Sequence, residues 1–176
     1  MDHEATVEGV GVGVSEEGPG APVVLLRVCE ELVPIFVSPD QAKSMQLAIE
    51  GTPFERPLTH DLLVDMVAEF GGAIDRVRID DIADGTFYAK VDTEQYHGGE
   101  RKKAVFDARP SDGIALSLRV DCPLLVSDEV VDEVGRPPDA FEETPEDAFR
   151  EPSDGPLGGP SDDPSVGEEP DYDDPL

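Results

Sequence analysis

Two hydrophobic patterns follow one another along the chain. In some runs every second residue is apolar, which is typical of β-strands, and in others apolar residues return every three or four positions, which is typical of amphipathic helices. The pattern predicts three strands, a helix, a second helix, three more strands, a third helix and a last extended piece. The predicted strands cover residues 5–14, 23–28, 32–37, 74–79, 86–91 and 101–107, and the extended piece covers 123–126.

The first and third predicted helices have clear start signals. Ser38 can cap the first helix, Pro39 suits its first position, and Gln41 completes a capping box. Apolar residues on one side then continue to Gly51. The third helix is predicted to begin at Pro110, directly after a strand, and to run through residue 118.

The second predicted helix begins at Thr59, which we expect to act as its cap, and ends at the glycine pair 71–72. Its apolar residues recur at helical spacing and are predicted to form a buried stripe. They are Leu62, Leu63, Met66, Val67 and Phe70.

The order of three strands followed by a helix that starts with proline occurs twice. This faint internal repeat predicts a duplicated three-strand-plus-helix unit. The expected fold class is therefore α+β. We expect six mostly antiparallel strands, curled or closed into a barrel-like sheet, with helices covering the open faces.

Composition divides the chain into a domain and a tail. Residues 1–135 carry the strand and helix patterns, whereas residues 136–176 are rich in Pro, Gly, Asp and Glu and are predicted to be a disordered tail. The two cysteines lack metal-finger spacing and are expected to be free, buried thiols. No apolar run is long enough to span a bilayer and no secretory signal is visible, so we expect a cytoplasmic protein.

The charge is strongly acidic, with 41 Asp or Glu against 13 Lys or Arg and a formal net charge of -28. Acidity spread over both domain and tail, with few lysines, indicates a halophilic protein; an ordinary acidic surface with an interacting tail is the alternative. Such charge first argues against a nucleic-acid partner. In molar salt, however, the screening length is only about 3 Å, so a nuclease is not excluded and would depend on short, directed contacts.

Polar residues gather at the starts of the second and third predicted helices. The first block holds Arg56, Thr59, His60 and Asp61, and the second holds Asp107, Arg109, Ser111 and Asp112. Helix N-termini attract anions, and arginine binds phosphate through a two-pronged guanidinium. Carboxylates can hold Mg²⁺ or Mn²⁺, and histidine can transfer protons near neutral pH. The alternative is structural: the carboxylates cap helices and pair with the arginines.

One basic run, at residues 101–103, lies in the last strand before the third helix. Lysines and arginines on an exposed strand edge usually prevent aggregation through that edge. Contact with nucleic acid is the second interpretation.

Several motifs resemble the bifunctional nuclease (BFN) domain family, in a haloarchaeal type of member. They are RPLTHDLL (56–63), DGTFYAKV (84–91) and DARPSDGIALSLR (107–119), supported by VPIFVSPDQA (33–42) and CPLLV (122–126). The resemblance implies a nuclease (DNase and RNase) acting on DNA and RNA substrates. The sequence departs from the family pattern at Ser38, Gln41 and Gly113, where Gly, Glu and Ala are common.

The resulting hypothesis is a metal-assisted phosphodiester hydrolase with little sequence preference. The catalytic candidates are Asp107, Asp112, His60 and Asp61. The phosphate-binding candidates are Arg56, Arg109, Ser111 and Thr59, and Asp107 and Asp112 are expected to hold Mg²⁺ or Mn²⁺. The alternatives are a non-catalytic module that binds nucleic acid or protein, and a small-molecule anion sensor. A homo-oligomer is left open.

Overall fold

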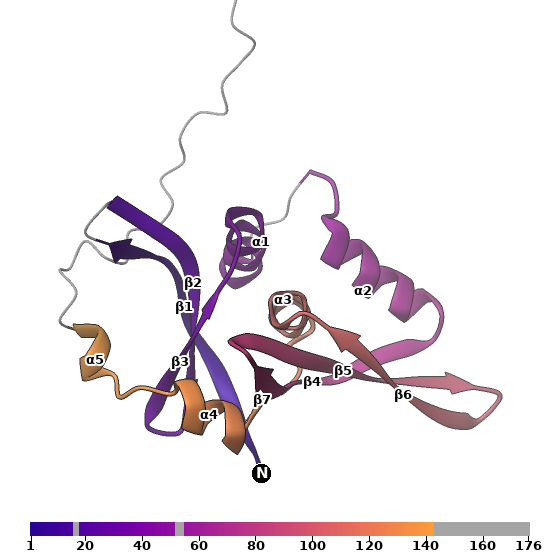
Figure 1. The fold of residues 1–176 in the computed structure, drawn as a ribbon. Helices are drawn as coiled ribbons and strands as arrows, with labels where there is room; N and C mark the ends of the chain where they lie inside the picture. Colours follow the sequence, from indigo (N-terminus) through magenta and orange to yellow (C-terminus); the bar gives the residue numbers. More distant parts are fainter. Residues whose placement is uncertain (16–17, 52–54, 143–176) are drawn as a thin grey trace, which may run out of the picture.

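The computed structural model describes residues 1–15, 18–51 and 55–142 (Figure 1). Seven strands and five helices follow one another in these residues. The strands are β1 (Asp2–Ser15), β2 (Gly18–Val28), β3 (Glu31–Phe36), β4 (Gly72–Ala83), β5 (Thr86–His97), β6 (Glu100–Ala108) and β7 (Leu124–Ser127). The helices are α1 (Pro39–Glu50), α2 (Thr59–Glu69), α3 (Pro110–Val120), α4 (Asp128–Val134) and α5 (Asp139–Glu142).

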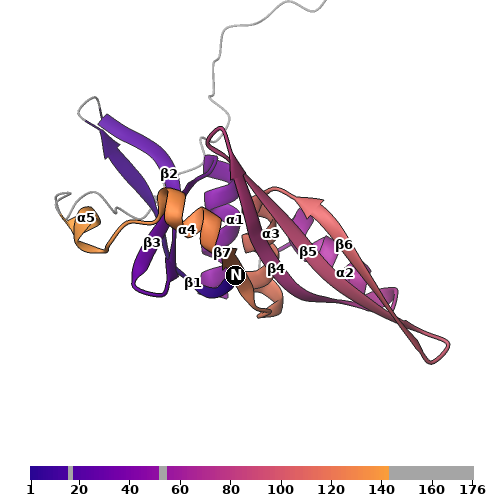
Figure 2. The same cartoon turned by 60° about the horizontal axis from the view of Figure 1, so that its bottom comes forward.

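All seven strands form one sheet in the order β3-β2-β1-β7-β4-β5-β6. The α+β class is confirmed, and each half is an antiparallel meander followed by a helix that starts with proline. The expected barrel is wrong, because β3 and β6 lie at opposite ends of an open sheet (Figures 1 and 2). The predicted extended piece is the strand β7. It joins the two halves by pairing antiparallel with β1 and parallel with β4.

The predicted starts of α1 and α3 are confirmed. The Ser38 side chain accepts from the backbone N–H of Gln41 at 3.3 Å, and the Gln41 side chain accepts from the backbone N–H of Ser38 at 2.8 Å. Arg109 is the residue before α3 and Pro110 is its first. The α3 helix lies very close to the sheet, because a Cβ added at Gly113 would be 2.7 Å from Cγ1 of Val77.

The main core lies between the sheet and the helices α1 and α3, which pack against each other. The helix α4 contacts β3, β4 and β7, and its Val130 is fully buried. The largest fully buried side chains are Leu26, Met45, Ile79, Ile114, Val24, Val28, Val33, Val77, Val126 and Val130. Among the described residues, none of the helices has the length and apolar character that crossing a bilayer requires.

The prediction for α2 is wrong in two respects. The residue before the helix is Leu58, whose backbone N–H donates to Asp61 at 2.8 Å, so Thr59 is the first helical residue and not the cap. The predicted buried stripe is mostly exposed, and Phe70 is 68% exposed. The reason is that α2 packs against α3 and β4 with Val64 against the core, whereas Leu63 and Val67 line a cleft and the other apolar side chains are exposed.

The start of the predicted tail is structured. Arg136 and Leu32 exchange two backbone hydrogen bonds beside β3, and Phe141 in α5 packs against Val23, Leu25 and Leu32. The rest of the predicted tail, from residue 143, lies outside the described residues. Both cysteines are free, but Cys29 is exposed and Cys122 is half-buried, so the expectation of buried thiols is wrong.

Candidate active site

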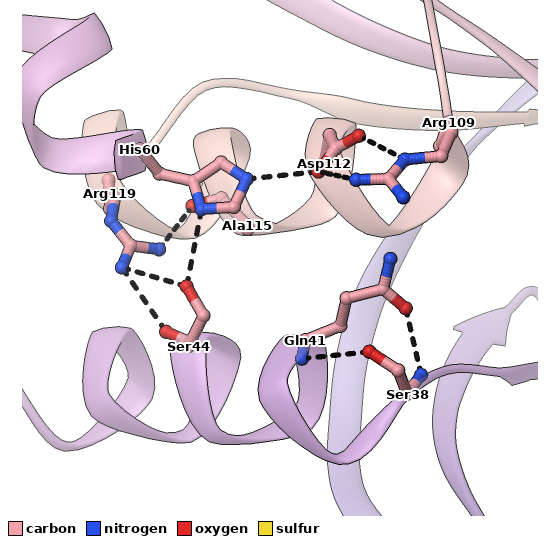
Figure 3. A network of polar contacts seen from close by, with 8 residues as sticks. All are labelled: Ser38, Gln41, Ser44, His60, Arg109, Asp112, Ala115 and Arg119. Atoms are coloured by element: carbon pink, nitrogen blue, oxygen red, sulfur yellow. Dashed lines mark hydrogen bonds and ion pairs between the residues drawn. The ribbon is translucent and has the colours of Figure 1, made fainter. Parts of the chain in front are cut away.

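The two polar blocks meet between α2 and α3. Nε2 of His60, in the first turn of α2, lies 3.2 Å from Oδ1 of Asp112, in the first turn of α3 (Figure 3). Nδ1 of the same ring lies 3.3 Å from Oγ of Ser44 on α1. The imidazole therefore connects three helices.

The partners of His60 determine which atoms donate and which accept in this series of hydrogen bonds. Burial disfavours the charge on Asp112, but the hydrogen bonds from Arg109 and His60 outweigh it and hold the pKa of Asp112 below its ordinary value. An ionised Asp112 only accepts, so in the neutral ring Nε2 of His60 carries the proton. Nδ1 then accepts from the Ser44 hydroxyl, which itself accepts from Nη2 of Arg119 at 3.2 Å.

Arg119 holds the other end of this network. Its side chain is only 8% exposed, and Nε donates to Oδ1 of Asp61 at 2.5 Å. It also donates to the carbonyl oxygens of Ala115 and Ser44. Burial acts against the charge on Asp61, but hydrogen bonds from Arg119 and from the Leu58 backbone N–H keep the pKa of Asp61 below its ordinary value. Oδ1 of Asp61 thus holds α2 against α3, while Oδ2 accepts from the Leu58 backbone N–H at the start of α2.

Arg109 lies at the open end of the network. Its guanidinium donates two hydrogen bonds to Asp112, from Nε at 2.6 Å and from Nη2 at 3.0 Å, while its side chain remains 71% exposed. Since Asp112 uses Nε and one N–H of Nη2, the edge formed by Nη1 and Nη2 remains as a two-pronged donor toward solvent. Asp112 partly neutralises the positive charge of this guanidinium.

A cleft with a volume of about 530 Å³ opens beside these residues. Its polar end is formed by Thr59, His60, Arg109 and Asp112. Its remaining wall comes from α2, α3 and the strands β4, β5 and β6 and includes Thr93 and Asp107, but is otherwise apolar. The apolar residues are Leu63, Val67, Ile74, Val91, Phe106, Ala108 and Leu116. A mostly apolar cleft with a few convergent polar groups is the usual form of a ligand site.

Asp107 is among the residues that line the cleft, but its side chain belongs to a different network. It lies directly opposite Lys90 in the β5–β6 pair, so its side chain shares the outer face of the sheet with that of Lys90. The pKa of the Lys90 amine is raised, first by its hydrogen bond to Asp80 and also by the charge of Asp107. Phe106, the next residue back, lines the cleft on the other face.

The described residues therefore do not bring Asp107 and Asp112 into one contact network. Nor do they contain a group of three or more His, Cys, Asp or Glu side chains close enough together to hold a metal ion. The metal site stays a prediction from the sequence.

The remaining candidates occupy different positions around the cleft. Thr59 is exposed and lines it. Arg56 is exposed in the loop before α2, whereas Ser111 is buried in the first turn of α3. The hydroxyl of Ser111 is thus less accessible to a phosphate than the side chains of Thr59 and Arg109.

Sequence reasoning missed Ser44 and Arg119. Arg119 lies seven positions after Asp112, and this helical spacing places both on one side of α3. An arginine on the otherwise apolar side of a helix was the available signal. Ser44 carried a weaker one, as a single hydroxyl beside Met45 on the buried side of α1.

A second His–Asp pair lies outside the cleft. Nε2 of His3 is 2.5 Å from Oδ1 of Asp128, and Nδ1 of His3 is 3.5 Å from Sγ of Cys29. This pair joins β1 to α4 and offers a matched comparison for His60 and Asp112.

Comparisons with known proteins agree with the resemblance seen in the motifs. The family model described as the bifunctional nuclease domain matches residues 23–139. Two proteins of Mycobacterium tuberculosis, the uncharacterized proteins Rv1829 (strain H37Rv) and MT1877 (strain CDC 1551), are each 36% identical over 127 residues, which cover 70% of this chain and 73% of theirs. Bifunctional nuclease 2 of rice, Oryza sativa subsp. japonica, is 27% identical over 119 residues, which cover 66% of this chain and 36% of that protein.

Proposed function

Because the chain belongs to the bifunctional nuclease domain family, we propose that it is a nuclease that hydrolyses phosphodiester bonds of DNA and RNA with little sequence preference. The observation that carries the proposal is the contact between His60 and Asp112 at the polar end of the cleft. Residues 52 positions apart in sequence meet there, beside an exposed arginine. Convergence of an acid–base residue, a carboxylate and a phosphate-binding group is what such a reaction requires.

Each residue has a distinct role in this proposal. Arg109 binds a non-bridging phosphate oxygen through its exposed guanidinium. His60 transfers a proton at the reacting phosphate, and Asp112 orients the ring and stabilises its charged form. Since both ring nitrogens are hydrogen-bonded, substrate binding has to replace one of the two partners of His60.

Ser44, Asp61 and Arg119 position the reacting groups. Arg119 fixes the Ser44 hydroxyl against Nδ1 of His60 and holds Asp61 at the start of α2. In this account Asp61 is therefore a positioning residue. Thr59 adds a hydroxyl donor in the cleft, and Arg56 is exposed in the loop before α2.

That Mg²⁺ or Mn²⁺ assists the hydrolysis remains a prediction from the sequence. The residues do not fit a cation shared by Asp107 and Asp112, because the two carboxylates lie in separate networks. We therefore derive no step through a metal. We also retain the proposal that the protein works in the concentrated salt of a cytoplasm, as its charge of -28 suggests.

The test is an assay of the purified protein on single-stranded and double-stranded DNA and RNA in high salt. Parallel reactions contain Mg²⁺, Mn²⁺ or a chelator. Cleavage of both nucleic acids at many sequences is expected. Absence of cleavage under every condition would contradict the proposal.

A second candidate function is a non-catalytic module that binds nucleic acid. It is favoured by the full occupation of His60 and Asp112 by partners within the protein. This candidate predicts saturable binding without turnover, so the same assay combined with a binding measurement distinguishes the two.

A further inference from the structure

The strand β6 leaves an unusual edge on the sheet. It is the last strand of the order, and all its residues except Ala108 are exposed. The other edge is partly paired, since Arg136 exchanges two backbone hydrogen bonds with Leu32 of β3. Within the described part of the chain, nothing pairs with the outer edge of β6. An open edge exposes a row of unpaired backbone donors and acceptors.

Protection from aggregation does not account for the whole edge. The basic run at residues 101–103 has that effect, but only at one end of the strand. At the other end Val105 and Phe106 are 56% and 58% exposed, on opposite faces of the sheet. Exposed apolar residues also cover neighbouring α2, where Leu62, Leu63 and Met66 lie outside the core. Leu63 and Phe106 line the same cleft, and exposed apolar surface of this kind usually marks an interaction site.

The charges along β6 indicate which partner fits. After Glu100 the strand has three basic residues, Asp107 lies next to its end, and Ala104 is in the middle. When two copies of the edge pair antiparallel with Ala104 opposite itself, Arg101 lies opposite the partner's Asp107, and this happens twice. A parallel pair would place the basic runs against each other. The edge is thus complementary to a second copy of itself.

We propose that two copies of this chain form a two-fold dimer by pairing their β6 edges antiparallel about Ala104. A two-fold axis perpendicular to the sheet keeps α2 of both subunits on the same face, on either side of the axis. The dimer covers the open edge and brings the exposed apolar residues of the two α2 helices toward the interface.

The same pairing adds a cation to each cleft. Lys102 and Phe106 lie on the face of the sheet toward α2, and Phe106 lines the cleft. With Ala104 on the axis, the partner's Lys102 lies opposite Phe106. The cleft's own Arg109 is paired with Asp112, so the partner supplies a further positive charge for a phosphate. This consequence rests on the proposed function, whereas the dimer itself does not.

Lys102 and Lys103 test that consequence, because they lie on opposite faces of the same strand. Lys102→Gln is expected to raise the KM for nucleic acid, and Lys103→Gln is expected to leave it unchanged. Equal KM values for both variants would overturn the contribution of Lys102. If no variant and no wild-type protein cleaves nucleic acid while the dimer forms, the proposed function fails and the interface stands.

Charge reversal tests the interface without any activity. Arg101→Glu and Asp107→Arg each place like charges opposite one another at both ends of the paired edges. Each variant alone is expected to dissociate about tenfold more readily than wild type in sedimentation equilibrium at moderate salt. An equal mixture of the two restores opposite charges and should recover the wild-type dimer. Recovery also shows that both variants fold, which matters because Arg101 pairs with Glu94 in its own chain.

Cross-linking tests the register. Ala104→Cys, in a Cys29→Ser background, places two thiols opposite each other at the axis, within the reach of a disulfide. We expect rapid oxidation to a covalent dimer, and none for Glu50→Cys, at the exposed last residue of α1, in the same background. A monomer at all micromolar concentrations would overturn the proposal. So would a dimer that ignores both charge reversals and does not cross-link through position 104.

Discussion

Nε2 of His60 donates a hydrogen bond to Oδ1 of Asp112 at 3.2 Å, although the two residues start different helices and are 52 positions apart. This contact unites two sequence blocks that spacing alone could not place together. The contact also requires particular charges and positions of the residues around it, and substitutions can test these requirements.

The ionised form of Asp112 should stabilise the fold. Its pKa in the folded protein is below its ordinary value because hydrogen bonds from Arg109 and His60 outweigh the effect of burial. The stabilisation is therefore complete above the unfolded pKa of about 3.9 and is lost as the pH falls through the folded pKa. As the pH is lowered through this acidic range, Tm should fall less in Asp112→Asn than in wild type. Thermal unfolding of both proteins at a series of pH values measures this difference.

Asp65→Asn, on the exposed side of α2, is the control for this pH series. It should follow the wild-type curve. Identical pH dependence in Asp112→Asn and wild type would contradict the assignment of an ionised, hydrogen-bonded Asp112.

Arg119 should be important for stability, because it is buried and joins three helices. Arg119→Met leaves Asp61 and the Ser44 hydroxyl without their donor. We expect a loss of about 2 kcal/mol or more in the free energy of unfolding, measured with urea. Arg27→Met removes an exposed pair with Glu8 and should cost less than about 1 kcal/mol. Equal losses in the two variants would show that the Arg119 network adds little.

Gly113 should resist replacement even by alanine. Alanine favours helices by up to about 1 kcal/mol, but its Cβ would lie 2.7 Å from Cγ1 of Val77. We therefore expect Gly113→Ala to lower the free energy of unfolding by about 1–3 kcal/mol. Combined with Val77→Ala, which opens space at that contact, the substitution should cost clearly less than the sum of the two single changes. Strict additivity would indicate that α3 moves away from the sheet at no cost.

Local signals in the sequence predicted some elements well. The capping box at Ser38 and Gln41 and the proline starts of α1 and α3 were predicted because short-range geometry determines them. The open sheet was not, since the pairing of β7 between β1 and β4 depends on contacts between segments far apart in the chain.

In the candidate site, too, local features were predictable from the sequence and contacts between distant segments were not. The polar blocks could be found because they interrupt an apolar pattern, but their meeting could not be derived from spacing. Asp107 and Asp112 are close in sequence, yet strand alternation directs Asp107 to the face that carries Lys90. The apolar residues of α2 misled the prediction, because periodicity indicates an apolar side without showing what covers it.

The most direct test of the central claim is the cleavage rate of His60→Gln. Glutamine can still donate to Asp112 but cannot transfer a proton near neutral pH. The matched control is His3→Gln, since His3 pairs with Asp128 outside the cleft. The account predicts a rate lower by about 10²–10⁴ for His60→Gln and an unchanged rate for His3→Gln on the same substrate. Equal rates for His60→Gln and wild type would contradict it.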